Sequence, residues 1–145
     1  LDGYIHVNIQ QREPVLRVMT GEGYYVDRDG KVMPLSSKFT SRVVVATGDI
    51  NKKFACEKLG PFAMKLKKEP FWDAYIEQLV VRSNEDVVMI PKVGDFRIVL
   101  GKVEGCEERL EKLMLFLKDG IAKKGWNRYK EINLKFDNQV VCVRK

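Results

Sequence analysis

Three short apolar runs between residues 76 and 100 constrain the fold of this chain more than any other feature. They cover residues 76–82, 87–90 and 96–100, and only a few turn-forming residues separate them. Runs of this length, rich in valine and isoleucine and bounded by Ser, Asn, Pro and Gly, are typical of consecutive strands. The sequence therefore predicts a β-meander in the middle of the chain.

One long amphipathic segment follows the meander, over residues 104–124. Its apolar side chains recur at helical spacing, while most of its charged side chains fall between them. Gly125 is a suitable C-terminal cap for such a helix. We expect the helix to lie on the sheet rather than to bind a partner. Its apolar positions are Cys106, Leu110, Leu113, Leu117 and Ile121.

Strand patterns also occur on both sides of these elements, and shorter helices are expected near residues 50–68. Thr47, Gly48 and Asp49 offer caps for the first helix, and Gly60-Pro61 is expected to break or kink it. The sequence predicts an α+β fold: a mostly antiparallel twisted sheet, with a meander and a terminal hairpin, on which the long helix and shorter helices pack. The further strands are expected at residues 4–10, 15–19, 42–46, 132–136 and 139–144.

The stretch Asp27-Arg28-Asp29-Gly30 has the composition of a calcium-binding loop or of a tight turn. A calcium loop of the EF-hand type needs a glycine at its sixth position and a carboxylate at its twelfth. The twelfth residue is Lys38 if Asp27 comes first, and Ser36 if Gly30 comes sixth. Neither alignment supplies the carboxylate. We interpret the stretch as the turn of a β-hairpin, with Gly30 at positive φ.

The length of 145 residues fits one domain, or one domain with a fragment of another. An apolar content of 45% and a charged content of 32% are those of a folded protein rather than of a disordered one. No apolar run approaches the roughly 20 residues of a membrane-spanning helix. Because the chain begins with Leu1 and not with methionine, we expect it to be part of a longer protein, with any anchor upstream.

The chain carries 26 basic and 20 acidic side chains, for a net charge of +6. This excess is compatible with nucleic acid or an anionic membrane surface as a partner. The densest basic groups, residues 65–68 and 123–128, lie at predicted helix ends, where cations complement the helix dipole. Solvated helix ends are the favoured interpretation. A basic nucleic-acid or anionic-surface binding module remains the alternative function.

Few residues of the chain suggest chemistry. His6, the one histidine, lies on the polar side of a predicted strand, and Cys56, Cys106 and Cys142 form no C-x-x-C pair. We therefore predict no metal site and no cofactor. The sequence does not decide whether the three cysteines are buried thiols or whether two of them form a disulfide. No nucleophile elbow, phosphate loop or dinucleotide fingerprint occurs, so we predict no enzyme; a hydrolase built on scattered carboxylates is the competing hypothesis.

The last predicted strand, residues 139–144, is apolar at adjacent positions, so both of its faces carry hydrophobic side chains. Such a strand at the edge of a sheet exposes backbone groups that recruit an added strand. Alternatively, Val140 and Val141 pack between two layers. The pattern alone leaves both interpretations open.

Four stretches of the chain, in this order, carry a family resemblance: residues 9–15, 26–32, 98–101 and 132–138. Together they resemble the FtsQ/DivIB family of bacterial cell-division proteins. In that family an R-x-P-V strand closes a small POTRA domain and a V-D-x-x-G-x-V hairpin opens the β domain. An L-G strand then precedes a long helix, and a D-L-R-Y strand leads into a terminal hairpin.

The resemblance implies a single-pass protein of the bacterial inner membrane whose POTRA and β domains lie on the periplasmic, extracytoplasmic side. Residues 1–18 would be the end of the POTRA domain, and residues 19–145 the β domain. Such proteins are scaffolds of the division machinery and not enzymes. Their C-terminal edge binds partners of the FtsB and FtsL type by strand addition, which implies neither a nucleic-acid partner nor a small-molecule substrate.

The resemblance also places the partner-binding residues on the last hairpin. They correspond to an aromatic residue after the penultimate strand, to the turn, and to the last strand. The chain departs from the family pattern at Asn133, where Asp is usual, at Gln139, where Gly is common, and at Arg144, where some members have an aromatic residue. The implied partner-binding residues are Phe136, Asn138, Gln139, Val140 and Arg144.

Overall fold

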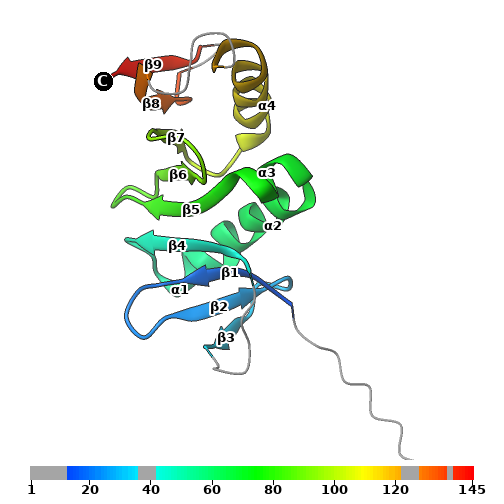
Figure 1. Ribbon diagram of the computed structural model, residues 1–145. Coiled ribbons are helices and arrows are strands. Elements are labelled where there is room, and N and C mark those ends of the chain that lie inside the picture. Colours follow the sequence, from blue (N-terminus) through cyan, green and yellow to red (C-terminus); the bar gives the residue numbers. More distant parts are fainter. Residues whose placement is uncertain (1–12, 36–41, 122–127, 137–138) are drawn as a thin grey trace, which may run out of the picture.

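The computed structural model describes residues 13–35, 42–121, 128–136 and 139–145. Nine strands in these ranges form one sheet, in the order β3-β2-β1-β4-β5-β6-β7-β8-β9 (Figure 1). The predicted strand at residues 4–10 lies outside the described residues. The strands are β1 (Pro14–Val18), β2 (Tyr24–Asp27), β3 (Val32–Pro34), β4 (Val44–Gly48), β5 (Ile76–Val81), β6 (Val87–Pro91), β7 (Arg97–Gly101), β8 (Tyr129–Asn133) and β9 (Val141–Arg144).

The α+β class is confirmed, but the prediction of a mostly antiparallel sheet is wrong because the sheet is mixed. The predicted meander, β5-β6-β7, and the terminal hairpin, β8-β9, are antiparallel as expected. However, β1 is parallel to β4, β4 to β5, and β7 to β8. Helical segments connect β4 to β5 and β7 to β8. A helical connection of this kind returns the chain to the end of the sheet where it started, and so makes neighbouring strands parallel.

The first helical connection begins at Asn51, and not at Thr47, Gly48 or Asp49. The Asn51 side chain accepts a hydrogen bond from the Phe54 N–H at 2.7 Å, which satisfies one donor that the first turn leaves open. The chain then remains helical through Gly60-Pro61, after a π-helical segment. The elements are α1 (Lys52–Phe54), η1 (Ala55–Leu59), α2 (Gly60–Lys68) and α3 (Pro70–Tyr75).

The predicted long helix is only partly confirmed. Helix α4 (Cys106–Phe116) is shorter than expected, and a π-helical segment, η2 (Leu117–Ile121), follows it. The end expected at residues 122–124 lies outside the described residues. Cys106, Leu110 and Leu113 are buried, as the helical spacing predicts. In Figure 1 α4 lies beside the β7–β9 end of the sheet, and α2 lies beside its middle.

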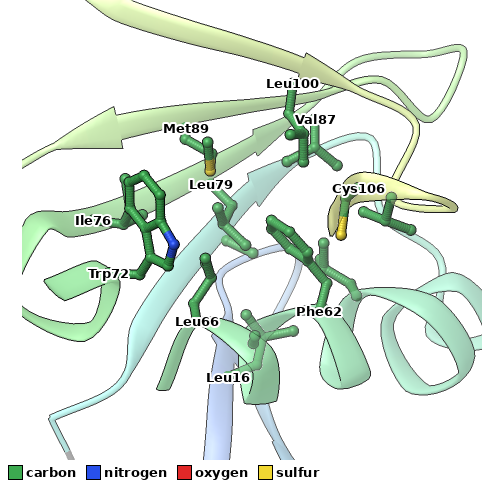
Figure 2. Packing of buried hydrophobic residues seen from close by; sticks show 14 of the residues in the cluster. Leu16, Phe62, Leu66, Trp72, Ile76, Leu79, Val87, Met89, Leu100 and Cys106 are labelled. Carbon is green, nitrogen blue, oxygen red and sulfur yellow. The ribbon is translucent and has the colours of Figure 1, made fainter. Parts of the chain in front are cut away.

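The core lies between the sheet and these helices (Figure 2). Leu79, in β5, is paired with Met89 in β6, and neither side chain has any exposed surface. Phe62 and Leu66 reach the same cluster from α2. Burial of each large apolar side chain stabilises the fold by about 1.5–3 kcal/mol relative to exposure. The middle of the sheet therefore holds the two ends of the molecule together.

The hairpin around Asp27 is confirmed. Strands β2 and β3 are antiparallel, and the Asp27 Oδ1 atom accepts the N–H groups of Asp29 and Lys31, each at 2.9 Å. Gly30 has a φ of +77°, which a residue with a Cβ rarely adopts. The carboxylate thus closes a turn by hydrogen bonds to its own backbone, as aspartate commonly does.

Candidate functional site

Strand β9 forms one end of the sheet. It pairs with β8, and the part of the chain that the structure describes places no strand on its other side. The pairing is antiparallel, with Ile132 opposite Cys142 and Asn133 opposite Val141. Of the two interpretations of this segment, the structure shows the one in which it is an edge strand.

Two backbone hydrogen bonds establish which groups of β9 point away from β8. The Lys145 N–H donates to the Arg128 carbonyl at 3.2 Å, across the hairpin, and the Leu134 N–H donates to the Val99 carbonyl at 2.9 Å, on the other side of β8. Because backbone groups alternate along a strand, the odd-numbered residues of β9 direct their N–H groups to β8. The Arg144 N–H therefore points to the open side of the edge.

The two faces of β9 differ in what they contact. Cys142, and Val140 just before the strand, pack against the hydrophobic core. Val143, by alternation, faces the other side of the sheet, where it lines a shallow hollow that also includes Val80 and Ile90. All of β9 apart from the exposed Arg144 is half-buried. An added strand would thus find apolar neighbours on both faces.

The predicted partner-binding residues lie at both ends of this edge. Phe136 is 52% exposed, and its carbonyl accepts a hydrogen bond from the N–H of the exposed Gln139 at 3.4 Å. Val140 is half-buried, and Arg144 is exposed at the far end of β9. The structure therefore brings Phe136 and Gln139 together at the turn and separates both from Arg144. Asn138 lies outside the described residues.

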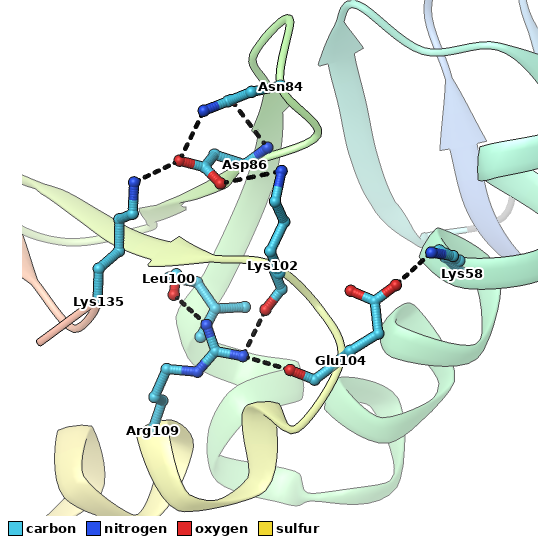
Figure 3. Close-up of polar contacts among 8 residues, drawn as sticks. All are labelled: Lys58, Asn84, Asp86, Leu100, Lys102, Glu104, Arg109 and Lys135. Atoms are coloured by element: carbon cyan, nitrogen blue, oxygen red, sulfur yellow. Dashed lines mark hydrogen bonds and ion pairs between the residues drawn. The ribbon is translucent and has the colours of Figure 1, made fainter. Parts of the chain in front are cut away.

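A buried carboxylate that no sequence pattern marks lies close to the hairpin. Asp86, in the β5–β6 turn, is 3% exposed and accepts a hydrogen bond from the Lys135 Nζ atom at 2.7 Å (Figure 3). The Asn84 amide donates to the same oxygen, Oδ2, at 3.1 Å, and the other oxygen, Oδ1, lies 3.5 Å from the Lys102 Nζ atom. The hydrogen bond from Lys135, above all, holds the pKa of the Asp86 carboxyl below its usual value.

Two cations of α4 complete the support of this end of the sheet. Arg109 donates to the carbonyls of Leu100 and Glu104, each at 2.7 Å (Figure 3). Lys112 donates to the Phe136 carbonyl at 2.8 Å. The Lys112 contact joins residues 24 positions apart, so no local sequence pattern could have revealed it. The one sequence feature that reflects these contacts is the glycine at position 101. A Cβ there would lie 3.0 Å from the Lys135 side chain and 3.1 Å from that of Arg109.

The other candidates from the sequence do not form a site in the described part of the chain. His6 lies outside it. No three His, Cys, Asp or Glu side chains gather closely enough there to hold a metal ion. No disulfide joins Cys56, Cys106 and Cys142, and burial, chiefly, raises the pKa of Cys56 and Cys106. Among the basic residues, Lys65 is at the end of α2 and pairs with Glu107.

No helix in the described ranges is both long enough and apolar enough to cross a membrane.

Comparison with protein families places the chain beside a known family. The model of a family described as FtsQ/DivIB, C-terminal related, matches residues 13–143. This range includes all of the strands and helices of the fold up to the middle of β9. No curated protein matches the chain.

Proposed function

The chain belongs to the FtsQ/DivIB C-terminal related family, and we propose that it is a non-enzymatic scaffold domain of the bacterial division machinery that binds a partner strand at β9. The position of β9 at the end of the sheet carries this proposal. A terminal strand presents main-chain donors and acceptors in a row, and an extended peptide can continue the ladder.

The proposed partners are proteins of the FtsB and FtsL type, the partners that the family resemblance implies. Main-chain hydrogen bonds to β9 supply affinity in this mode, and side chains beside the strand supply specificity. Phe136, Asn138, Gln139 and Val140 would contact the partner near the turn, and Arg144 would do so at the far end. The half-buried Val141 and Val143 would flank an apolar partner strand on one face, and Cys142 would do so on the other.

The family also suggests where the domain acts. Its members are generally anchored in the membrane with this domain outside the cytoplasm, and we place the chain on the extracytoplasmic side of the inner membrane, with the anchor helix outside this sequence. We assign residues 1–18 to the end of a POTRA domain and residues 19–145 to the β domain. Strand β1, within the first of these ranges, pairs with β2 and β4 and so continues the sheet.

Proline at Arg144 tests the main-chain mechanism directly. Arg144→Pro removes the N–H that points to the open side of the edge, and it disturbs no bond from β9 to β8. Arg144→Ala removes the side chain but keeps the N–H. We would titrate both variants and the intact chain, by calorimetry, with the soluble FtsB–FtsL segment from the same organism.

We expect Arg144→Pro to weaken binding roughly tenfold or more, and Arg144→Ala to weaken it by only about threefold, as for a charge at the rim of an interface. Circular dichroism checks that both variants stay folded. Undiminished binding by a folded Arg144→Pro variant would show that β9 is not the site. Failure of the intact chain to bind would refute the proposed partners.

A further inference from the structure

The residues just after β8 are held by contacts with three distant parts of the chain, two made by side chains and one by a backbone carbonyl. Lys135 follows this strand closely, and its ammonium group bonds to Asp86, which lies 49 positions earlier, in the β5–β6 turn. Lys112 of α4 donates to the Phe136 carbonyl. The Leu134 N–H donates to the backbone carbonyl of Val99 in β7. The chain thus enters the last turn from a fixed position.

Asp86 is suited to act as the fixed point of this arrangement. Its carboxylate is buried, and the Asp86 N–H donates to the Asn84 side-chain oxygen at 3.2 Å, which secures the residue within its own turn. The Arg82 N–H donates to the Asp86 carbonyl at 2.9 Å, which ties this turn to the end of β5. A charged hydrogen bond to a buried, immobile partner is stronger and more directional than one on the surface.

The glycine at position 101 provides the space that this contact requires. A Cβ there would lie 3.0 Å from Cγ of Lys135 and would push the lysine stem away from β7. Lys135 therefore crosses the end of β7 over a residue that has no side chain, and its ammonium group reaches Asp86 beyond it (Figure 3).

We infer that Asp86 is a positioning residue for the edge strand: through Lys135 it holds the end of β8, and with it the β8–β9 hairpin, in the orientation that presents β9 to a partner. The inference deepens the proposed function and rests on it for the role in binding. A strand that is already ordered loses less conformational freedom when a partner adds to it, so the same contacts give a higher affinity.

Hydrogen exchange under native conditions tests the positioning without any partner. Asp86→Asn and Lys135→Met are expected to speed exchange of the β9 amides about tenfold, because a charged hydrogen bond is lost, while amides of β5 and β6 keep their rates. A purely structural role would instead speed exchange across the whole sheet. Lys135→Arg retains a cationic donor, so the β9 amides of this variant are expected to exchange as slowly as those of the intact protein.

Lys102→Met is the matched control. Lys102 lies 3.5 Å from the same carboxylate but precedes α4 and is not part of the hairpin, so its loss is expected to leave β9 exchange unchanged. Unchanged β9 exchange in both Asp86→Asn and Lys135→Met would overturn the inference, as would an equal effect of Lys102→Met.

Titration with the FtsB–FtsL segment measures the consequence for binding. Asp86→Asn and Lys135→Met are expected to weaken binding about tenfold, and to do so non-additively when combined, because they break the same contact. Normal affinity in variants with fast β9 exchange would overturn the role in binding. Absence of binding by the intact chain would instead refute the proposed function, and exchange would still decide whether Asp86 positions β9.

Discussion

The sheet has two ends, and they are built differently. Strand β3, at one end, has three residues, and the third is Pro34. Strand β9, at the other end, has four residues and no proline. The Asp27 N–H donates to the Lys31 carbonyl, so by alternation Pro34 lies at a position that faces away from β2. Pro34 therefore occupies on β3 the kind of position that Arg144 occupies on β9, but it has no N–H to offer.

The hairpins that carry these edges also differ. In the β2–β3 hairpin the turn is closed by its own residues, through the Asp27 carboxylate and the positive φ of Gly30. In the β8–β9 hairpin the approach to the turn is held from α4 and from the β5–β6 turn, by Lys112 and Asp86. A short strand with a proline is a common protection against strand addition, whereas an edge that binds a partner must remain open and ordered. The two ends therefore differ in length, in proline content and in what holds their hairpins, as the proposed binding at β9 requires.

The largest expected loss of stability comes from a substitution in the hydrophobic core at the middle of the sheet, which both ends of the sheet adjoin. Leu79 is fully buried in the central strand β5, and Leu79→Ala is expected to lower the free energy of unfolding by about 2–5 kcal/mol. Urea denaturation followed by circular dichroism measures the loss, with the exposed Glu77→Ala as control. Hydrogen exchange should accelerate at both ends together; a loss confined to one end would show that the core is not shared.

Proline at Val143 is expected to damage one end only. The Val143 N–H points to β8, so Val143→Pro removes a ladder hydrogen bond and leaves a carbonyl of β8 without its donor, at a cost of about 1–3 kcal/mol. The β8–β9 amides should lose protection while those of β2 and β3 keep it. Arg144→Pro, one position along, is the control and should be nearly neutral for stability. Equal destabilisation by both prolines would contradict the alternation described for β9.

At the opposite end, Gly30→Ala is expected to destabilise the β2–β3 hairpin by about 1–2 kcal/mol, because alanine at a φ of +77° is strained. The added Cβ would also lie 3.0 Å from the Cys56 carbonyl oxygen. Gly21→Ala separates the two causes, since its φ is +60° and nothing lies within 4 Å of its Cβ. Thermal denaturation of Gly21→Ala measures the cost of the backbone strain alone. The additional destabilisation in Gly30→Ala measures the cost of the close approach to the Cys56 carbonyl oxygen. Partner binding at β9 should not change in either variant.

Opening the blocked edge is expected to change association more than stability. Pro34→Thr restores an N–H on the open side of β3, and it costs under about 1 kcal/mol through the greater freedom of the unfolded chain. Sedimentation velocity at rising concentration should detect self-association in this variant and not in the intact protein. A monomeric variant at every concentration would mean that the proline is not what protects this edge.

The smallest expected effect is a dependence on pH at the β9 end. Because the pKa of Asp86 is held below its ordinary value of 3.8, its ionised form stabilises the folded state. This stabilisation is complete at neutral pH, begins to decline near the ordinary pKa, and is lost as the pH falls through the lower value of the folded state. The difference in unfolding free energy between the intact protein and Asp86→Asn should therefore shrink on acidification. A difference that persists well below that range would show that charge is not the cause.

Much of the fold could be predicted from local patterns. The meander, the Asp27 hairpin and the buried face of α4 follow from periods of two and of about 3.6 residues and from turn chemistry, which act over a few neighbouring positions. The parallel pairs could not be predicted in the same way, because a strand pattern does not state the direction of its neighbour. The cap at Asn51 was missed since several adjacent residues have side chains that can cap a helix.

For the candidate site, the sequence located the last strand, but it left open whether the strand is at an edge. That question depends on the order of strands, and strand order results from the packing of helices that cross from one strand to another. Asp86 looked like an ordinary turn residue, because a carboxylate between Glu85 and Val87 carries no sign of a lysine 49 positions away.

By itself, therefore, the sequence determined the meander, the Asp27 hairpin, the apolar face of α4 and the family. Only the tertiary structure decided that β9 ends the sheet, that Pro34 lies on the outer side of the opposite edge strand, and that Asp86 and Lys112 contact the residues leading into the last hairpin. The physical reason is range: hydrophobic periodicity and turn preferences act between neighbours in the chain, whereas edges and ion pairs depend on which distant segments the buried core brings together.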